Sequence, residues 1–528
     1  HSAVRLEGQL NIAALERSFA FLVHRHETLR TTFELHDGQP IQVISPQLDL
    51  IVEHEDVTES ALNTVLETEA SRPFDLATGP LLRVKLLHLG TDDHVLSLTM
   101  HHIVSDGWSM SVLIGEIGSL YEAFSKDESP ALPELPIQYA DFARWQHEWL
   151  NGDVLATQLD YWKKQLDDVA TLKLPTDHPR PLIRSHRGSK HPFTLPRELA
   201  LALIKLARTE SVTLFTVLLA AWQTLLLRYT GQTDVAIGTP IANRNRFETE
   251  ALIGFFVNTL VLRTDLSRNP TFRELLERVF SVVLDAQAHQ EVPFEKIVEE
   301  MQLERSLSYT PLFQVMFALH NAPVHVIDLP EMKLFTMEVA RATARFDLTC
   351  ELFERGGYIS GAIEYSTELF DAETITRLLG HYERLLSAIA EDPDQRILEL
   401  PFLTDAEERQ LLYEWNEVAP QTMPQRPLHA LFEEQVKRDP EAVAVVLGDE
   451  RVTYGELNER ADKVANRLRR LGVGPETIAG IFIDRSVELV VAVLGILKAG
   501  GAYLPLDIEL PKERIAFMLD DARPAVIL

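Results

Sequence analysis

Two clusters of proline interrupt this 528-residue chain, one at residues 175–181 and one at residues 401–427. Proline breaks helices and the middle of sheets, so each cluster predicts a linker between folded parts. The length also exceeds what one hydrophobic core supports, because domains typically hold about 100–200 residues. We therefore expect three folded units and one long linker, at 1–172, 173–400 and 429–528, with the linker at 401–428.

Each expected unit mixes helical and strand patterns. In the first unit, helices are expected at 12–22, 108–124 and 139–166, and neighbouring strands at 81–89 and 95–102. In the second, helices are expected at 195–208, 214–229, 275–290 and 370–389, and strands at 235–241, 312–320 and 358–365. In the third, helices are expected at 431–436, 454–471 and 489–497, and strands at 479–483 and 502–506. This mixture predicts an α/β fold.

Composition excludes several classes of function. With 50 basic and 79 acidic residues the formal charge is −29, which argues against binding to nucleic acid or to an anionic membrane. The single cysteine, Cys350, cannot form an internal disulfide, and it suits a reducing, cytoplasmic compartment. The longest apolar stretches, 212–227 and 489–497, fall short of the roughly 20 clean residues of a membrane span, so we expect buried helices there.

Residues 100–109 form the sharpest local feature, with two histidines at the end of an apolar strand. Adjacent side chains in a strand point to opposite faces, so only one of His101 and His102 can enter a given cleft. The spacing does not choose between them. Asp106 follows, just before Gly107 permits a sharp turn, and its carboxylate could cap the next helix, orient an imidazole or pair with a distant arginine.

Three interpretations of this segment remain open. The first is a buried histidine pair with a helix-capping aspartate. The second is a metal site, because His102 and Asp106 have i,i+4 spacing, but Gly107 argues against a helix there and adjacent strand histidines diverge. The third is a general base at the mouth of a cleft.

Other catalytic signatures are missing from the sequence. No phosphate-binding loop, dinucleotide-binding glycine motif or nucleophile elbow is present, and the nearest segment to the last of these, residues 107–111, fails at its final position. Cys350 lies in an expected strand and is better explained as a core residue than as a nucleophile.

The histidine segment belongs to a set of motifs. The chain resembles a condensation domain of a nonribosomal peptide synthetase over residues 1–400, followed by the start of an adenylation domain. The matching condensation segments, in the family's order, are 25–33, 101–107, 139–145, 253–259, 289–295 and 305–315. The matching adenylation segments are 452–457 and 497–507. The family's first motif would precede residues 2–8, so we expect the first unit to begin after it.

The resemblance implies a two-lobed, V-shaped fold similar to chloramphenicol acetyltransferase, with a tunnel between the lobes. It implies an amide-forming acyltransferase that joins an acyl or peptidyl thioester on an upstream carrier domain to an aminoacyl acceptor on a downstream one. The partners would be these carriers and the rest of a multidomain synthetase, with no nucleic acid and no membrane. The condensation domain would bind no cofactor, since 4'-phosphopantetheine is supplied on the carriers. ATP and Mg²⁺ would act only in a complete adenylation domain, so no adenylation is expected from residues 429–528.

The resemblance also assigns roles to residues. His102 would be the catalytic histidine in the tunnel and His101 its structural neighbour. Asp106 would be a structural aspartate paired with Arg263, and Gly107 would leave room for the carrier's arm. Three further residues would line the substrate channel: Ser105, Trp108 and Asn258. No metal is implied.

Two alternative functions accompany this interpretation. One is epimerisation or another carrier-dependent acyl transfer, which the Trp108-Ser109 pair after Gly107 disfavours. The other is a catalytically silent docking domain, which the presence of both His102 and Asp106 disfavours. A heterocyclising enzyme would carry aspartate at the position of His101. Residues 305–317 resemble domains that join two L-configured residues.

Overall fold

In the computed structural model the chain divides into two units, His1–Leu412 and Tyr413–Leu528. The structure describes residues 1–302, 306–320, 332–337, 343–417 and 426–528. Arg305, which belongs to the segment that resembles the L-to-L type, lies outside the described residues. Pro420 and Pro424 of the expected linker also lie outside them, and each unit is described below by itself.

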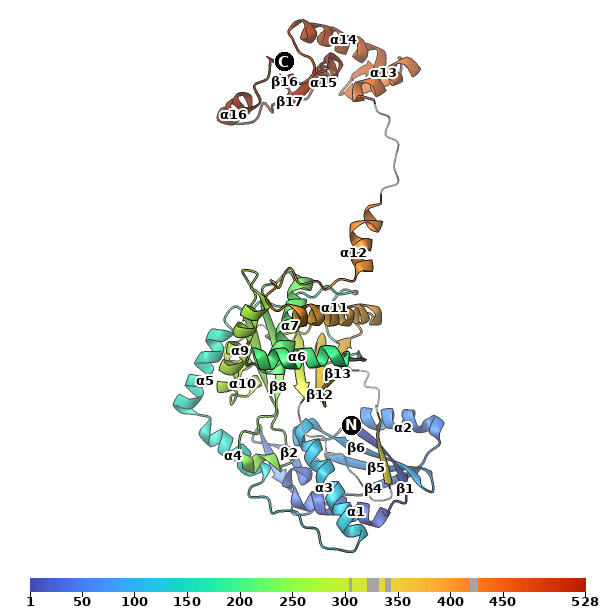
Figure 1. Ribbon diagram of the computed structural model, residues 1–528, viewed down its shortest axis with the longest axis vertical. Coiled ribbons are helices and arrows are strands. Elements are labelled where there is room, and N and C mark those ends of the chain that lie inside the picture. The colour runs from blue at the N-terminus through green and yellow to red at the C-terminus, as the bar shows by residue number, and fades with distance from the viewer. Residues whose placement is uncertain (303–305, 321–331, 338–342, 418–425) are drawn as a thin grey trace. The chain divides into compact units, whose positions relative to one another are not determined.

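A five-stranded sheet in the order β11-β1-β6-β5-β4 organises the first lobe of unit one (Figure 1). Its strands are β1 (Ser2–Gly8), β4 (Val52–Asp56), β5 (Leu82–Gly90), β6 (Asp93–Met100) and β11 (Met332–Met337). Leu86 packs in a core with α1 (Ile12–Arg25) and α3 (Gly107–Ser125), whereas its neighbour Leu87 packs in a core with α2 (Glu59–Ser71). Helices therefore cover both faces. The antiparallel β5–β6 pair confirms the two neighbouring strands expected at 81–102.

A six-stranded sheet in the order β7-β13-β12-β10-β8-β9 organises the second lobe. Its strands are β7 (Gly188–Thr194), β8 (Asp234–Ile241), β9 (Asn258–Asp265), β10 (Val315–His320), β12 (Leu348–Arg355) and β13 (Tyr358–Ser366). Its helices are α6 (Arg197–Thr209), α7 (Leu214–Thr230), α9 (Phe272–Ala288), α10 (Phe294–Met301) and α11 (Ala372–Glu391). Trp222 of α7 is fully buried against Phe317 and Tyr382, so the apolar stretch at 212–227 is a core helix, as expected.

Two segments cross the expected boundary at residue 172. Strand β11 comes late in the sequence but pairs antiparallel with β1 of the first lobe. Helix α5 (Gly152–Gln165) comes early, yet its Leu159 and Trp162 are buried in the core of the second lobe. The apolar side chains of α5 explain its position, because that core removes them from water. The helix expected at 139–166 is in fact two, α4 (Tyr139–Trp149) and α5.

Shorter elements complete unit one. They are β2 (Thr31–His36), β3 (Gln39–Ile44), α8 (Phe247–Glu250) and α12 (Asp405–Leu412). Among the described residues, no single helix combines the length and hydropathy needed to cross a membrane, and one bent pair, α6 with α7, passes that test only when the two are joined.

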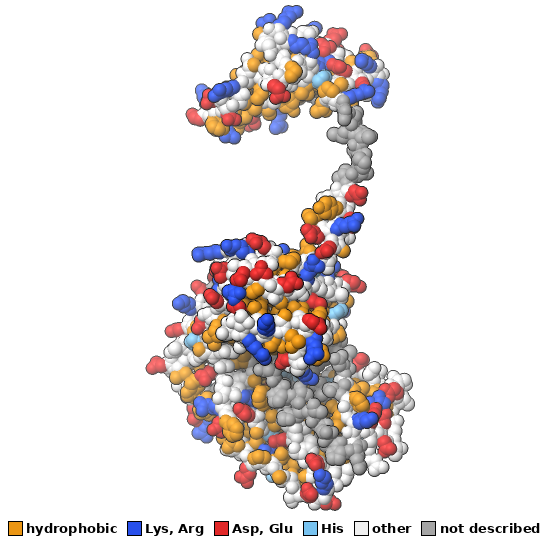
Figure 2. All heavy atoms as spheres, in the orientation of Figure 1, with side chains coloured by type: hydrophobic (Ala, Val, Ile, Leu, Met, Phe, Trp, Pro, Cys, Tyr) orange, Lys and Arg blue, Asp and Glu red, His pale blue; other side chains and the backbone are white. Residues whose placement is uncertain are grey.

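Unit two contains a parallel three-stranded sheet in the order β17-β16-β18 and an antiparallel hairpin, which confirms the expected α/β layer. Its strands are β14 (Val443–Leu447), β15 (Glu450–Thr453), β16 (Ile478–Ile481), β17 (Ala502–Pro505) and β18 (Val526–Ile527). Its helices are α13 (Leu428–Arg438), α14 (Tyr454–Arg470), α15 (Val487–Ala499) and α16 (Lys512–Ala522). Large hydrophobic side chains such as Val446 and Phe517 are exposed, and Figure 2 shows hydrophobic atoms on the visible face of this unit.

Acid should weaken one contact that ties α12 to α11. Glu407 accepts hydrogen bonds from the Thr404 backbone N–H (2.8 Å) and hydroxyl (2.7 Å), and its Oε1 lies 2.9 Å from His381 Nε2. Burial opposes the charge, but these contacts outweigh it and lower the pKa of Glu407 to about 2. A lowered folded-state pKa stabilises the fold above the unfolded value of about 4.3, and the effect is lost as pH falls toward 2. We expect Glu407→Gln to destabilise the protein at pH 7, by a margin that shrinks below about pH 4.

Urea unfolding of the parent and the variant at several pH values measures this margin. Asp405→Asn, at an exposed carboxylate of the same helix, is the matched control and should show little change. A margin that stays constant from pH 7 to pH 3 would contradict the assignment.

Candidate active site

The two neighbouring histidines lie at the exit of β6, in a short turn between the strand and α3. The strand ends at Met100, and His102–Val104 form a single turn of 3-10 helix that His101 caps by accepting a hydrogen bond on Nδ1 from the Ile103 N–H (3.1 Å). The strand expected at 95–102 is therefore two residues too long. Both histidines lie beyond the strand, so their side chains diverge because of the turn and not because of alternation along a strand.

The two imidazole rings point to different partners. The His101 ring meets Phe74 edge-on at 5.8 Å, and burial, followed by the charge of His102, lowers the pKa of His101. The exposed ring of His102 instead meets Phe255 edge-on at 5.0 Å, across the junction between the lobes. Within the described residues no hydrogen bond reaches the His102 side chain, so both ring nitrogens are open to a substrate.

Asp106 is the capping residue of α3. Its Oδ1 accepts hydrogen bonds from the Ser109 N–H (2.8 Å) and from the Ser109 hydroxyl (2.7 Å), and its Oδ2 accepts one from the Phe256 N–H (3.0 Å). The side chain is 3% exposed and ion-paired to Arg244, whose Nη2 lies 3.2 Å from Oδ1. Asp106 thus joins the start of α3 to the segment that follows β8.

Arg263 is not the partner of Asp106, so the expected pair was wrong. Arg263 lies on β9 and binds Asp234 at the start of the neighbouring strand β8, with Nη2 2.8 Å from Oδ2. Its Nη1 also donates to the backbone carbonyls of Gln165 and Asp167. These contacts hold its guanidinium on the second-lobe sheet, away from Asp106.

Ser109 also links the start of α3 to the segment that follows β8, a role that sequence reasoning missed. Ser109 Oγ accepts hydrogen bonds from the Gly254 N–H (3.0 Å) and from Arg244 Nη2 (2.9 Å), and it lies 2.8 Å from the Gly254 carbonyl oxygen. Tyr139 adds a bond from its hydroxyl to the Phe255 carbonyl (2.9 Å). Burial, followed by the charge of Asp106, raises the pKa of Tyr139 to about 12, so this phenol stays neutral. Residues 254–256, whose Phe255 contacts His102, are therefore held by Asp106, Ser109 and Tyr139, which all belong to the first expected unit.

Three of the remaining expected site residues, Ser105, Gly107 and Trp108, lie at or next to the turn. A Cβ at Gly107 would meet no atom within 4 Å, so open space lies beside the start of α3. Trp108 is half-buried and donates from Nε1 to the Glu250 carbonyl (2.9 Å), and Ser105 is buried with its Oγ 3.5 Å from the His101 carbonyl. These three residues follow His102 directly in the chain, at the end of its turn and in the first residues of α3.

Asn258 does not fit the substrate-channel role expected for it. Its side chain is buried and saturated by backbone groups, donating to the carbonyls of Gln290 (2.8 Å) and Val292 (2.7 Å). Its Oδ1 accepts from the N–H groups of Thr259 and Phe294. Both donors and the acceptor oxygen of the side-chain amide are therefore hydrogen-bonded, and they connect β9 to the turn before α10.

Replacing Asn258 should therefore affect stability rather than chemistry. Asn258→Ala leaves buried backbone groups without partners, at a cost of about 1–3 kcal/mol each. We expect a lower melting temperature and an unchanged transfer rate per folded molecule. A variant that melts like the parent but transfers more slowly would restore the channel role.

Metal-binding groups are not gathered at this turn. Within the described ranges, no three His, Cys, Asp or Glu side chains converge in a way that could hold a metal ion.

Comparison with known proteins places the turn and its two lobes in a family. Residues 1–412 match the condensation domain family, and residues 432–528 match the AMP-binding enzyme family. A linear gramicidin synthase of Brevibacillus parabrevis is 47% identical over 538 residues, which cover 100% of this chain and 7% of that protein. Gramicidin S synthase 2 of Brevibacillus brevis is 39% identical over 524 residues, which cover 99% of this chain and 12% of that protein. The chain thus spans a small part of the length of the relatives it matches.

Solved structures agree with the sequence match. The X-domain from teicoplanin biosynthesis is 32% identical, covers 76% of this chain and 92% of its own, and superposes with a TM-score of 0.71. A four domain nonribosomal peptide synthetase bound to AMP and glycine shares the fold at 24% identity, with a TM-score of 0.76 over 99% of this chain and 41% of its own. The expected two-lobed condensation fold is confirmed. The chain therefore belongs to the condensation domain family and continues into a region that matches the start of an AMP-binding enzyme.

Proposed function

We propose that this chain forms a peptide bond between two carrier-bound substrates, the synthesis expected from the sequence. The amine nitrogen of the downstream aminoacyl group attacks the carbonyl carbon of the upstream thioester. A C–N bond forms, the C–S bond breaks, and the sulfur leaves on the upstream carrier. The amine gives up one proton and the leaving thiolate takes one, so the reaction needs no oxidant or outside reactant.

The exposed imidazole of His102 is the observation that carries the proposal. It stands at the junction of the lobes, its ring set by the Phe255 contact and its nitrogens open within the described chain. An imidazole so placed can take the proton from the attacking amine or donate a hydrogen bond to the tetrahedral intermediate. Open space lies beside Gly107, at the start of α3 and close in sequence to His102, and a long thioester arm could approach there.

Magnitudes rank the possible contributions of this site. An α-amino group has a pKa of about 7.7–8.0, so deprotonating it near pH 7 costs only about 1 kcal/mol. General base catalysis accelerates a reaction about 10²–10⁴-fold, which corresponds to roughly 3–5 kcal/mol of activation free energy. Aligning two tethered reactants lowers the barrier by about 7–11 kcal/mol. Alignment of the two thioester arms is therefore the larger effect, and the rigid anchoring of Asp106 supports it.

The finer assignments rest on the resemblance. We propose an L-configured donor and acceptor, 4'-phosphopantetheine supplied by the two carrier domains, and a place within a multidomain synthetase. We also propose lobes at residues 1–172 and 173–400, with β11 and α5 exchanged across that boundary.

Single-turnover transfer between two loaded carriers tests the function. We expect the upstream acyl group to appear in amide linkage on the downstream carrier, detected by mass spectrometry of the arm. Inversion of the donor's α-carbon without transfer would favour epimerisation. Carrier binding without any change in either thioester would favour a silent docking domain.

A further inference from the structure

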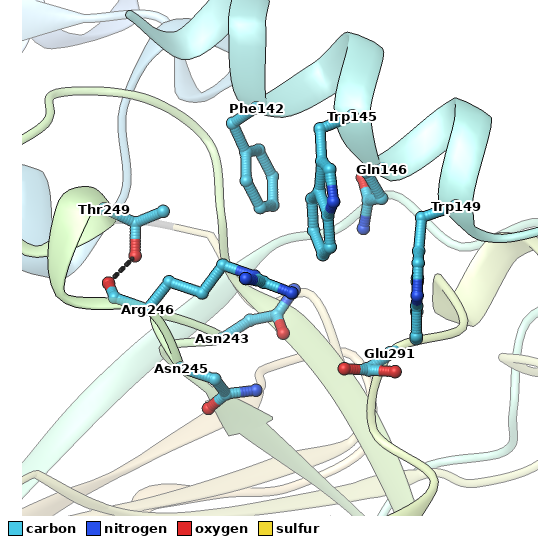
Figure 3. A pocket seen from close by; sticks show the side chains of 9 residues that line it. All are labelled: Phe142, Trp145, Gln146, Trp149, Asn243, Asn245, Arg246, Thr249 and Glu291. Atoms are coloured by element: carbon cyan, nitrogen blue, oxygen red, sulfur yellow. Dashed lines mark hydrogen bonds between the residues drawn. The ribbon is translucent and has the colours of Figure 1, made fainter. Parts of the chain in front are cut away.

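A pocket apart from His102 opens between α4 and the segment that follows β8 (Figure 3). The space between its walls is about 370 Å³ when the open solvent at its mouth is included, so the pocket is a shallow, open one. One wall is aromatic and comes from a single face of α4, where Phe142, Trp145 and Trp149 follow at helical spacing. The other lining residues are polar: Gln146, Asn243, Asn245, Arg246, Thr249 and Glu291.

Polar side chains face this aromatic wall with their bonding capacity unused. Among the described residues, no hydrogen bond or ion pair reaches the side chains of Gln146, Asn243, Asn245 or Glu291. Glu291 is half-buried, and burial raises the pKa of its carboxyl group while the charge of Arg246 opposes the rise. A carboxylate that has lost water without gaining an ion pair is a group for which a bound cation would compensate.

Arg246 does not fill that role. Its guanidinium lies 4.2 Å from the centre of the Trp145 ring, a cation–π contact. No ion pair between Arg246 and Glu291 is present in the described structure. The Trp149 ring stacks beside Trp145 at 5.5 Å, and Figure 3 shows Trp149 and Glu291 on the same side of the pocket. Arg246 therefore contacts the Trp145 ring, and among the described residues no cation contacts the Trp149 ring.

We propose that this pocket binds a guanidinium or primary ammonium group, held against Trp149 and paired with Glu291. An aromatic ring attracts a cation, the carboxylate accepts its charge-assisted hydrogen bonds, and the side-chain carbonyls of Asn243 and Gln146 can accept the rest. An anion would meet the Glu291 charge, and an apolar group would leave that charge without a partner. The same head group is offered by a basic side chain of a polypeptide and by a small free cation.

A neighbouring groove adds two carboxylates to the surroundings of the pocket. A groove next to it uses the same Phe142, Trp145 and Arg246 and adds the carboxylates of Asp141 and Glu248. The field at the mouth therefore favours the approach of a cation. This site goes beyond the proposed peptide-bond formation, because none of its lining residues belongs to the turn that carries His102.

Calorimetric titration of the whole chain tests the proposal with three probes. Methylguanidinium represents a free cation, N-acetyl-arginine amide represents a polypeptide side chain, and N-acetyl-citrulline amide is the neutral isostere of the second. We expect saturable binding of the cations near 1 mM or below and at least about tenfold weaker binding of the citrulline probe. Tighter binding of the arginine probe than of methylguanidinium would identify a polypeptide source, and the reverse would identify a free cation. Equal binding of the arginine and citrulline probes, or no saturable binding, would overturn the proposal.

Variants locate the binding. Glu291→Gln should weaken cation binding at least about tenfold, whereas Arg246→Gln should strengthen it by removing a competing charge. Glu248→Gln, outside the pocket but in the neighbouring groove, is the matched control and should weaken binding far less than Glu291→Gln does. Trp149→Leu should also weaken binding, and it keeps the test decisive if Glu291→Gln does not fold. Parent-like binding by a folded Glu291→Gln, or loss of binding in Arg246→Gln, would show that the site is wrongly assigned.

Discussion

Replacing His102 with alanine should slow amide formation by at least about 100-fold while the protein stays folded. That factor corresponds to about 2.7 kcal/mol in activation free energy. The fold should survive because the ring is exposed and makes no hydrogen bond within the described residues, so its removal costs only the contact with Phe255. Single-turnover transfer between two loaded carriers gives the rate, and thermal melting gives the stability.

His147→Ala provides a matched control for that measurement, since it removes an exposed imidazole from α4. The control should transfer at the parent rate. His101→Ala is a different comparison, because His101 caps the turn and its loss should disturb stability. If His102→Ala transfers as fast as the parent, alignment alone accounts for catalysis and the histidine has no direct role.

For the turn that carries His102, the sequence predicted that the two histidines diverge, but it did not predict the geometry that separates them. Alternation along a strand correctly predicted that His101 and His102 face different ways. The structure reaches that result through a 3-10 turn that begins at His102, two positions after the last strand residue, Met100. Three residues are too few to show any periodicity, so no sequence pattern distinguishes such a turn from the end of a strand.

The partner of Asp106 shows where motif reasoning ends. Helix capping and pairing with a distant arginine were two of the three roles left open for Asp106, and the structure shows both. Which arginine meets it depends on how the chain returns from the second lobe, and local patterns carry no information about that return. The resemblance assigned Arg263 to this role, but Arg263 pairs with Asp234 on the adjacent strand. Arg244 lies in an irregular segment without a motif.

Long elements of the fold could be predicted from the sequence. Helix α7 and the β5–β6 pair each span many residues, so their apolar patterns are repeated often enough to be recognised. The exchange of β11 and α5 between lobes was not predictable. Strand pairing between residues more than 300 positions apart, such as Leu6 with Leu334, leaves no mark on the pattern of either strand.

Replacing Asp106 with alanine should lower the melting temperature and the transfer rate together. The substitution leaves the Arg244 guanidinium, whose side chain is 1% exposed, buried without its counter-charge, a change that typically costs about 3–5 kcal/mol. Burial, only partly offset by Asp106, already lowers the pKa of Arg244. The same change removes the acceptor of the Phe256 N–H (3.0 Å), which holds the residue next to Phe255 and hence the ring that sets His102.

A double substitution separates the buried charge from the positioning effect. Asp106→Leu with Arg244→Met replaces both charges by apolar groups, and such replacements of a buried pair are often neutral, so stability should recover relative to Asp106→Ala. The transfer rate should stay low, because the bond to the Phe256 N–H is still missing. Arg263→Met is the matched control: its pair with Asp234 is partly exposed and contributes about 0–1 kcal/mol, so it should leave the transfer rate unchanged. If Asp106→Ala melts like the parent but loses all transfer, Asp106 acts in the chemistry itself rather than through the position of His102.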